Sequence, residues 1–256
     1  MQADLELFQK LSHKLVDHEK QNGVVKPIKA ENLLKVMDLN LEDQGLDEKK
    51  FEALLEEIVL STPRTSTKLF FNQLFGGRNS KGTLGELLAV MLNNSMYTYK
   101  VGGPQVGIEK MIIAKVCDML NFGKNADGTF PPGGSMSNFM AMLMARDAYN
   151  RDIKFEGVSE KMIIYTSSTS HYSITKNAMF GGIGIQQIRF IESDQYGKMI
   201  PKALQEQIEE DLKEGLKPFF VNATAGTTVM GAFDNIDEIH EVTKLYDKLW
   251  LHVDGA

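Results

Sequence analysis

The sequence predicts an α/β protein with a mainly parallel sheet flanked by helices, preceded by a helical N-terminal segment. Two observations lead to this fold class. From about residue 160 to the end, apolar strand-like runs alternate with helical patterns, and such alternation implies parallel strands joined by right-handed crossovers. The runs MIIY, FFV and LWLHV are almost unbroken, which is typical of strands that are covered on both faces.

The helical N-terminal segment is predicted over residues 1–75. Two apolar stripes at helical spacing lie within it: Leu5, Phe8, Leu11 and Leu15, then Phe51, Leu54, Leu55, Ile58 and Val59. Asp47 precedes the second stripe and is a suitable N-cap for that helix. Both helices carry dense charge on their other faces, so we expect them to pack on another surface, either a second subunit or the main domain.

A large domain is predicted over residues 76–256. It begins with two further helical patterns, at Leu84–Leu92 and Ile108–Met119, and then alternates. The predicted elements are strand 161–166, helix 172–180, strand 185–191, helix 201–214, strand 218–223, helix 235–248 and strand 249–253. Pro201 suits the first turn of its helix, and Gly215 suits its end.

Composition excludes several classes of function. With 256 residues and 43% hydrophobic side chains, the chain can bury a sizeable core. Its net charge of -6 argues against nucleic acid as the main partner. The single cysteine, Cys117, fits a reducing compartment. No signal peptide and no apolar run of about 18 residues is visible. We therefore expect a cytoplasmic protein without a membrane partner.

The segment PPGGSMSN, residues 131–138, supplies a glycine-rich entry into a helix. Two glycines let the backbone approach an anion closely, and free N–H groups at a helix N-terminus favour phosphate. Ser135 and Ser137 add hydroxyl donors. The alternative is an ordinary turn with a serine N-cap.

Two further motifs follow predicted strands, where open α/β sheets bind ligands. His171 could stack on a flat ring and transfer protons, or it could be satisfied by local hydrogen bonds. A serine hydrolase would need G-x-S-x-G, which is absent. Thr227 and Thr228 follow the next strand and could be simple turn hydroxyls.

Asp254 ends a very apolar strand, where an unpaired carboxylate would be costly. A protonated pyridine nitrogen is the partner that such a carboxylate would need. The alternatives are a strand-end cap or a metal pair with His252, which shares one face of the strand with Asp254. That pair lacks an obvious third ligand at metal-site spacing, so no metal is predicted.

The order and wording of these motifs resemble the group II pyridoxal-phosphate-dependent amino acid decarboxylases, which include glutamate, cysteine sulfinate and aspartate decarboxylases. The resemblance covers about residues 65–256 and the N-terminal half of such enzymes. It is most specific in NATAGTTVMGAFD and LWLHVD. It implies fold type I, similar to aspartate aminotransferase, with pyridoxal 5′-phosphate as cofactor. It also implies a homodimer with a shared active site.

The resemblance implies a role for individual residues. The backbone of Met136 and the side chain of Ser137 would hold the phosphate, and Thr228 would lie beside the cofactor. His171 would stack on the ring and act in catalysis. Asp254 would pair with the ring nitrogen and is the second catalytic residue. The lysine that holds the cofactor is expected beyond Ala256, so these 256 residues should be an inactive fragment, split chain or partial chain.

Gln73, Ser95 and Tyr97 lie in segments that resemble the family's substrate-facing ones, although aromatic residues there could also be plain core or interface residues. Lys100 departs from the glutamate that is common in the family, which leaves side-chain specificity open. Gly255 replaces a frequent alanine, a conservative change.

The expected reaction is decarboxylation of an acidic L-amino acid, namely aspartate, glutamate or cysteine sulfinate, to the amine and CO2. Ser95 and Tyr97 match cysteine sulfinate decarboxylases, and a tyrosine hydroxyl should favour a shorter substrate, so we predict aspartate. The alternatives are an aminotransferase or related enzyme of the same fold, a metal-dependent hydrolase using His171, His252 and Asp254, and a non-catalytic scaffold.

Overall fold

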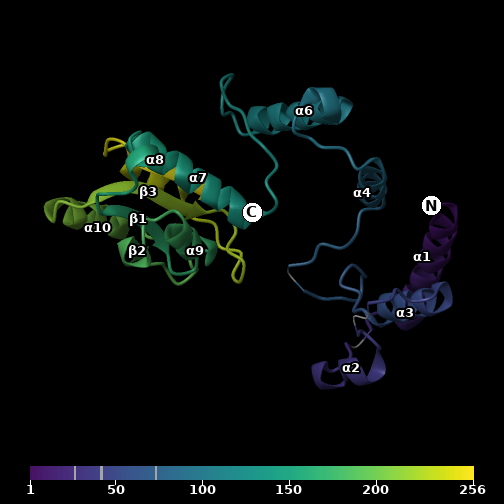
Figure 1. The fold of residues 1–256 in the computed structure, drawn as a ribbon. Helices are drawn as coiled ribbons and strands as arrows, with labels where there is room; N and C mark the ends of the chain where they lie inside the picture. Colours follow the sequence, from purple (N-terminus) through teal and green to yellow (C-terminus); the bar gives the residue numbers. More distant parts are fainter. Residues whose placement is uncertain (26, 41–42, 73) are drawn as a thin grey trace. The chain divides into compact units, whose positions relative to one another are not determined.

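The structure, a computed structural model, describes residues 1–25, 27–40, 43–72 and 74–256. The chain divides into two compact units, Met1–Ser95 and Met96–Ala256. Both units are drawn in Figure 1. The predicted domains, residues 1–75 and 76–256, are defined by their expected roles. The cofactor-binding role of the second domain stays a prediction.

The first unit is helical where it is described. Its elements are α1 (Gln2–Asn22), the 3-10 turn η1 (Ala30–Asn32), α2 (Leu33–Val36), α3 (Glu48–Ser61) and α4 (Ser80–Leu92). Asp47 is the N-cap of α3, as predicted, and its side chain accepts a hydrogen bond from Lys50 N at 3.0 Å. Helices α1 and α3 pack together and are bridged by an ion pair between Lys14 and Glu56 at 2.6 Å. Because this pair is solvent-exposed, it contributes little to stability.

The second unit contains a four-stranded parallel sheet in the order β2-β1-β3-β4. Its strands are β1 (Met162–Ser167), β2 (Ile188–Ile191), β3 (Lys217–Thr224) and β4 (Trp250–Asp254). Its helices are α5 (Tyr99–Gly102), α6 (Pro104–Met119), α7 (Gly134–Tyr149), α8 (Ile153–Glu156), α9 (Ser173–Phe180), α10 (Pro201–Lys213) and α11 (Ile236–Thr243), with a 3-10 turn η2 (Ile185–Gln187). The predicted parallel α/β architecture is confirmed.

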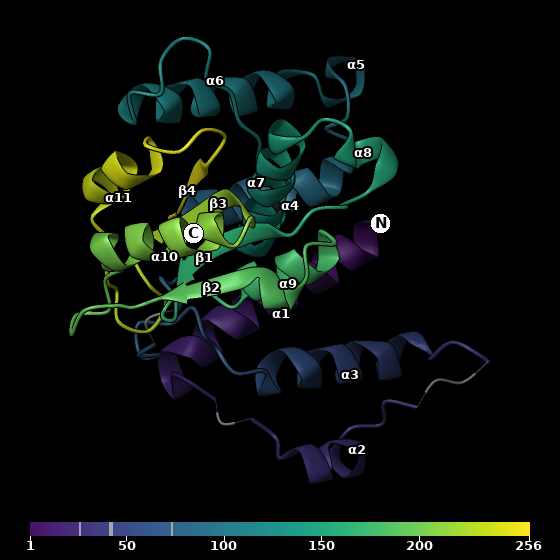
Figure 2. The ribbon, with the colours of Figure 1, turned by 90° about the vertical axis from the view of Figure 1, so that its left-hand side faces the viewer.

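Helices cover both faces of this sheet, which explains the nearly continuous apolar strands. On one face, α7, α8 and α9 pack against side chains such as Ile164 and Phe220. On the other face, α10 and α11 pack against side chains such as Ile163 and Val221. The layers can be followed around the sheet in Figure 2. Alternate residues of one strand therefore belong to two different cores.

Two predicted elements extend too far. The helix expected over 235–248 ends at Thr243, because tight turns follow and Lys248 takes a positive φ of 60° before β4 begins. Such a φ is outside the helical region for an ordinary residue. The strand expected over 185–191 begins only at Ile188, since the preceding residues form η2.

The strand order places a topological switch point between β1 and β3. The chain runs from β1 to its neighbour β2 and then crosses over to β3 on the other side of β1. In open α/β sheets, the crevice outside the carboxyl ends of such strands is where ligands bind. The segments that follow β1, β3 and β4 therefore form the candidate site.

No helix in the part of the chain that the structure describes is both long enough and apolar enough to cross a membrane.

Candidate active site

Asp254 is buried at the carboxyl end of β4, with 6% of its surface exposed. Its Oδ2 accepts a hydrogen bond from Asn138 Nδ2 at 2.9 Å, and its Oδ1 accepts one from Ala256 N at 3.2 Å. Among the described residues, no lysine, arginine or histidine forms an ion pair with this carboxylate. A buried carboxylate without a counter-charge is costly, so the site suits a ligand that brings a cation.

His252 lies two residues before Asp254 and is largely buried. Burial lowers the pKa of its imidazole, although the negative charge of Asp254 acts in the opposite direction. Its ring stacks on Phe220 with centroids 5.5 Å apart, and its Nε2 lies 2.8 Å from Asn138 Oδ1. The ring is therefore held between Phe220 and Asn138 of the second unit.

The predicted anion cradle lies at the start of α7. Gly133 takes a φ of 114°, which favours glycine, and the backbone hydrogen bonds of the first turn begin at Met136 N, which leaves the N–H groups of Gly134 and Ser135 ahead of them. A Cβ on Gly134 would lie 2.5 Å from the Cβ of Ala256, so a glycine is required where the chain after β4 passes the helix. This brings the cradle next to Asp254.

The two predicted phosphate-binding residues lie in this first turn. Met136 is exposed, and its N–H donates to Gly133 O at 3.0 Å. Ser137 is half-buried, and its hydroxyl lies 3.4 Å from the same carbonyl oxygen. Both residues are thus at the cradle, and their contact with a phosphate stays a prediction.

His171 follows β1 and is half-buried at the same sheet edge. Its Nδ1 accepts a hydrogen bond from Ser173 N at 3.2 Å, so the ring proton of the neutral imidazole is on Nε2. The ring lies against Tyr172, with centroids 4.3 Å apart. The backbone of α9 therefore fixes the orientation of the imidazole.

Thr228 is exposed in the turn after β3, whereas its neighbour Thr227 is buried. The Thr227 hydroxyl accepts a hydrogen bond from Ala232 N at 3.0 Å and thereby closes this loop. The structure thus assigns a loop-closing contact to Thr227, and it places the side chain of Thr228 on the surface. The role of Thr228 beside a cofactor stays a prediction.

The sequence reasoning missed two polar groups that tie the loops together. Ser170 Oγ lies 3.2 Å from Thr224 Oγ1, so it links the loop after β1 to the end of β3. Asp234 is buried, and its carboxylate accepts hydrogen bonds from Met199 N and Thr224 N, both at 2.7 Å. The acidic residue of the AFDN segment was the available signal for the second group.

The structure does not test the three predicted substrate residues. Gln73 lies outside the described residues. Ser95 ends the first unit, and Tyr97 lies near the start of the second with 90% of its surface exposed. Their roles stay predictions.

The metal-ligand alternative receives no geometric support. Within residues 1–25, 27–40, 43–72 and 74–256, no three histidine, cysteine, aspartate or glutamate side chains gather as a candidate ligand set. His252 faces Asn138, and His171 Nδ1 already accepts a backbone N–H.

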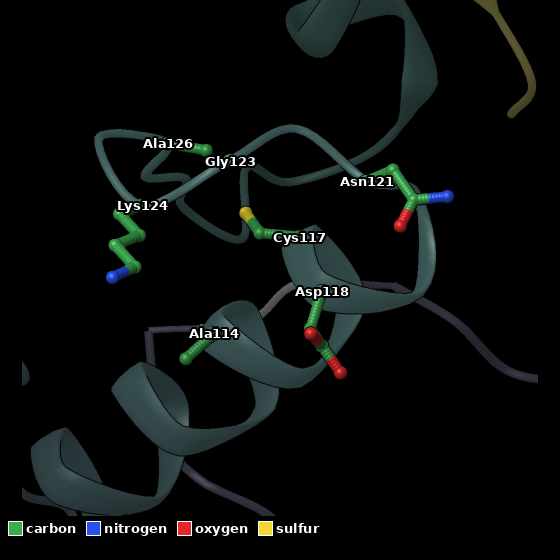
Figure 3. A pocket seen from close by; sticks show the side chains of 7 residues that line it. All are labelled: Ala114, Cys117, Asp118, Asn121, Gly123, Lys124 and Ala126. Carbon is green, nitrogen blue, oxygen red and sulfur yellow. The ribbon is translucent and has the colours of Figure 1, made fainter.

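A pocket of about 370 Å³ lies elsewhere, at the C-terminal end of α6. It is lined by Ala114, Cys117, Asp118, Asn121, Gly123, Lys124 and Ala126, as Figure 3 shows. None of the predicted site residues lines it.

The sheet edge therefore combines three features that fit one ligand. An anion cradle at α7 suits a phosphate, the buried carboxylate of Asp254 suits a cationic ring nitrogen, and the oriented imidazole of His171 suits a flat ring with a proton to transfer. These residues fit pyridoxal 5′-phosphate.

Comparison with known proteins agrees with this chemistry. The family model described as "Pyridoxal-dependent decarboxylase conserved domain" matches residues 30–256. The acidic amino acid decarboxylase GADL1 of Xenopus tropicalis is 41% identical over 228 residues, which is 88% of this chain and 44% of that protein. The cysteine sulfinic acid decarboxylase of Rattus norvegicus is 38% identical over 228 residues, or 88% of this chain and 46% of that protein.

Solved structures of the same kind share the fold. The crystal structure of mouse CSAD has a TM-score of 0.92 and 36% identity, and the match covers 99% of this chain and 55% of that chain. The chain thus spans less than half the length of the curated relatives described above.

Proposed function

We propose, from the premise that this chain belongs to the pyridoxal-dependent decarboxylase family, that the full-length protein decarboxylates an acidic L-amino acid to the amine and CO2. The observation that carries the proposal is the buried carboxylate of Asp254, which lies beside the start of α7 and has no counter-charge among the described residues. The printed names of the relatives, an acidic amino acid decarboxylase and a cysteine sulfinic acid decarboxylase, support the acidic substrate class.

Each residue at the sheet edge has a distinct task in this proposal. The first turn of α7, with Met136 and Ser137, binds the phosphate group. Thr228 borders the cofactor. Asp254 supplies the negative charge that keeps the ring nitrogen protonated. Pyridoxal phosphate, when bound, supplies an electron-poor ring that accepts the electron pair released when CO2 leaves.

His171 is proposed to serve both binding and proton transfer. The hydrogen bond from Ser173 N to its Nδ1 fixes the plane of the imidazole and leaves the proton on Nε2. A ring held in this way can cover a flat ligand and keep water from one of its faces. The Nε2–H can donate a hydrogen bond to the ligand, and it can be transferred as a proton if Nδ1 takes up a proton in place of its bond from Ser173 N, so that the imidazole stays neutral.

Aspartate is the proposed substrate, with β-alanine as product. The support is the pair Ser95 and Tyr97, which resembles the cysteine sulfinate decarboxylases, and the added bulk of the tyrosine hydroxyl. Gln73 is proposed to bind a substrate carboxylate. Lys100 adds a positive charge to the same stretch of chain.

We propose a cytoplasmic homodimer whose active site is shared by both subunits. The support is that α4 in the first unit and α6 in the second each carry exposed apolar side chains, since exposed apolar patches mark interaction sites. Examples are Leu84 and Leu88 on α4, and Met111 and Val116 on α6. The single Cys117 supports a reducing compartment. Light scattering of the full-length protein should give twice the monomer mass.

The reaction is tested directly on full-length protein. We expect purified protein to absorb visible light because of bound cofactor, borohydride to attach the cofactor covalently, and carboxyl-labelled acidic amino acids to release labelled CO2. Colourless full-length protein that takes up no pyridoxal phosphate would contradict the proposal.

A further inference from the structure

Asn138 has a position that the sequence motifs did not reveal. It lies in the second turn of α7 with 2% of its surface exposed, directly after the predicted phosphate-binding residues. Its Nδ2 donates to Asp254 Oδ2 at 2.9 Å and to Ser173 Oγ at 3.0 Å, and its Oδ1 lies 2.8 Å from His252 Nε2. One amide thus joins α7, α9 and β4.

The chemistry of these partners fixes the amide in one orientation. A carboxylate only accepts hydrogen bonds, so the NH2 group of Asn138 must face Asp254. The carbonyl oxygen of Asn138 then faces His252 Nε2 and requires a proton there. The imidazole therefore carries a proton on Nε2, and its burial, which lowers its pKa, favours the uncharged ring.

Asn138 also provides the one side-chain hydrogen bond to Asp254 in the described part of the chain. The other donor is the backbone of Ala256, which binds the opposite oxygen at 3.2 Å. Without Asn138, one oxygen of the carboxylate would lose its partner, and the carboxylate could rotate about its last side-chain bond.

We infer that Asn138 is a positioning residue: its amide sets the plane of the Asp254 carboxylate and engages His252 Nε2, so that the negative charge of Asp254 faces a cationic ring nitrogen. The inference rests on the proposed function. Asn138 acts through Asp254 rather than on the substrate or the reacting atoms.

The first test replaces Asn138 with leucine in the full-length holoenzyme. A charge-assisted hydrogen bond of this kind corresponds to about 10- to 100-fold in rate, so we expect kcat to fall by that factor with a smaller change in KM. Equilibrium dialysis with pyridoxal 5′-phosphate should show weaker binding by several-fold.

A matched control is Asn222→Leu, on the neighbouring strand β3. Asn222 is also fully buried, and its Nδ2 donates to Thr166 Oγ1 at 3.1 Å rather than to Asp254. Both variants should lower Tm, but only Asn138→Leu should weaken cofactor binding strongly. Equal weakening in the two variants would overturn the inference, because it would show a general effect of core disruption.

A second variant, Asn138→Asp, keeps the size of the side chain and tests the donor and the acceptor of the amide separately. It keeps an acceptor for His252 and removes the donor to Asp254. The titratable groups that face it are Asp254 and His252, both on β4. Because two adjacent carboxylates share a proton at low pH, its kcat relative to wild type should rise as pH falls. A constant ratio would overturn the inference.

A double-mutant cycle distinguishes this inference from the proposed function. If Asn138 acts through Asp254, Asn138→Leu should cost less than about twofold in an Asp254→Asn background. Additive losses would overturn the role of Asn138 and leave the proposed function intact. Full activity of the Asp254→Asn single variant would instead overturn the proposed function.

Discussion

The carboxylate of Asp254 and the imidazole of His171 are the two side chains whose loss should affect chemistry rather than folding. Each has its polar atoms oriented by backbone N–H groups of the second unit, from Ala256 and Ser173 respectively. Each also lies at the carboxyl-end edge of the sheet, which contains the switch point between β1 and β3. Substitution of Asp254 therefore removes a charge, and substitution of His171 removes an aromatic ring.

Replacing Asp254 with alanine in the full-length protein should lower turnover by about 10²–10³-fold. Loss of one partner of a buried charge pair costs about 3–5 kcal/mol, which corresponds to that factor or more if it is lost in the transition state. Steady-state kinetics measure it, with the exposed Asp237→Ala as control, which should stay within about twofold. A variant within a few-fold of wild type would show that Asp254 is merely structural.

Replacing His171 with glutamine should impair turnover while cofactor binding persists, because the phosphate cradle at α7 remains. Glutamine lacks the flat ring and the two ring nitrogens through which an imidazole exchanges protons. Dialysis against pyridoxal phosphate and kcat measurements separate the two effects, and the exposed His240→Gln provides the comparison. If the variant fails only by unfolding, as its Tm would reveal, the histidine is a packing residue.

At the scale of elements, a buried polar cluster joins β1, β2 and α10. The Tyr165 hydroxyl donates to Asp211 Oδ2 at 2.8 Å, and Arg189 Nε donates to the other oxygen at 2.9 Å. Burial, and then the hydrogen bond to Asp211, raises the pKa of Tyr165 far above its ordinary value of 10.0. The neutral hydroxyl is thus the form that the folded state requires.

This cluster predicts alkaline destabilisation. A tyrosine in the unfolded chain ionises near pH 10, whereas folded Tyr165 stays neutral, so its contribution is complete below pH 10 and is lost as pH rises further. Between pH 10 and 11, wild type should lose about 1 kcal/mol more unfolding free energy than Tyr165→Phe. Urea titrations at both pH values measure this. An identical loss in Tyr165→Phe, or an equal effect in exposed Tyr196→Phe, would contradict the assignment.

The sequence predicts the strands and their parallel pairing well because unbroken apolar runs have one common cause, burial on both faces. It does not predict where a backbone conformation ends an element. The positive φ of Lys248 is an example, because it leaves no trace in the pattern of hydrophobic residues. It predicts that Asp254 needs a partner but not that Asn138 provides one. Those residues are 116 positions apart, and no local pattern reports a contact over that separation. In α1 the apolar stripe correctly indicates a helix, but it does not show how deeply each side chain is buried, since Phe8 is half-exposed.

At the scale of the whole molecule, the proposed preference among acidic substrates rests on Ser95 and Tyr97. We expect kcat/KM to be higher for aspartate than for cysteine sulfinate or glutamate. The reason is that the hydroxyl of Tyr97 adds bulk, which favours a shorter substrate side chain. One methylene is worth about 1–3 kcal/mol. Assays of the three amino acids with full-length protein measure the preference, and Tyr97→Phe should narrow it. A clear preference for glutamate would refute the size argument and leave the decarboxylase assignment standing.

The hydrogen bond between Asn138 and Asp254 also sets the earliest point during translation at which the site can form. The two residues are separated by 116 positions, so α7 is made long before β4. At ~5–20 residues per second, translation of that interval takes roughly 6–23 seconds. During this time the cradle at α7 is without its acidic counterpart, and closing so long a loop is entropically slow. A nascent chain should therefore gain cofactor affinity only after β4 has emerged and paired with β3.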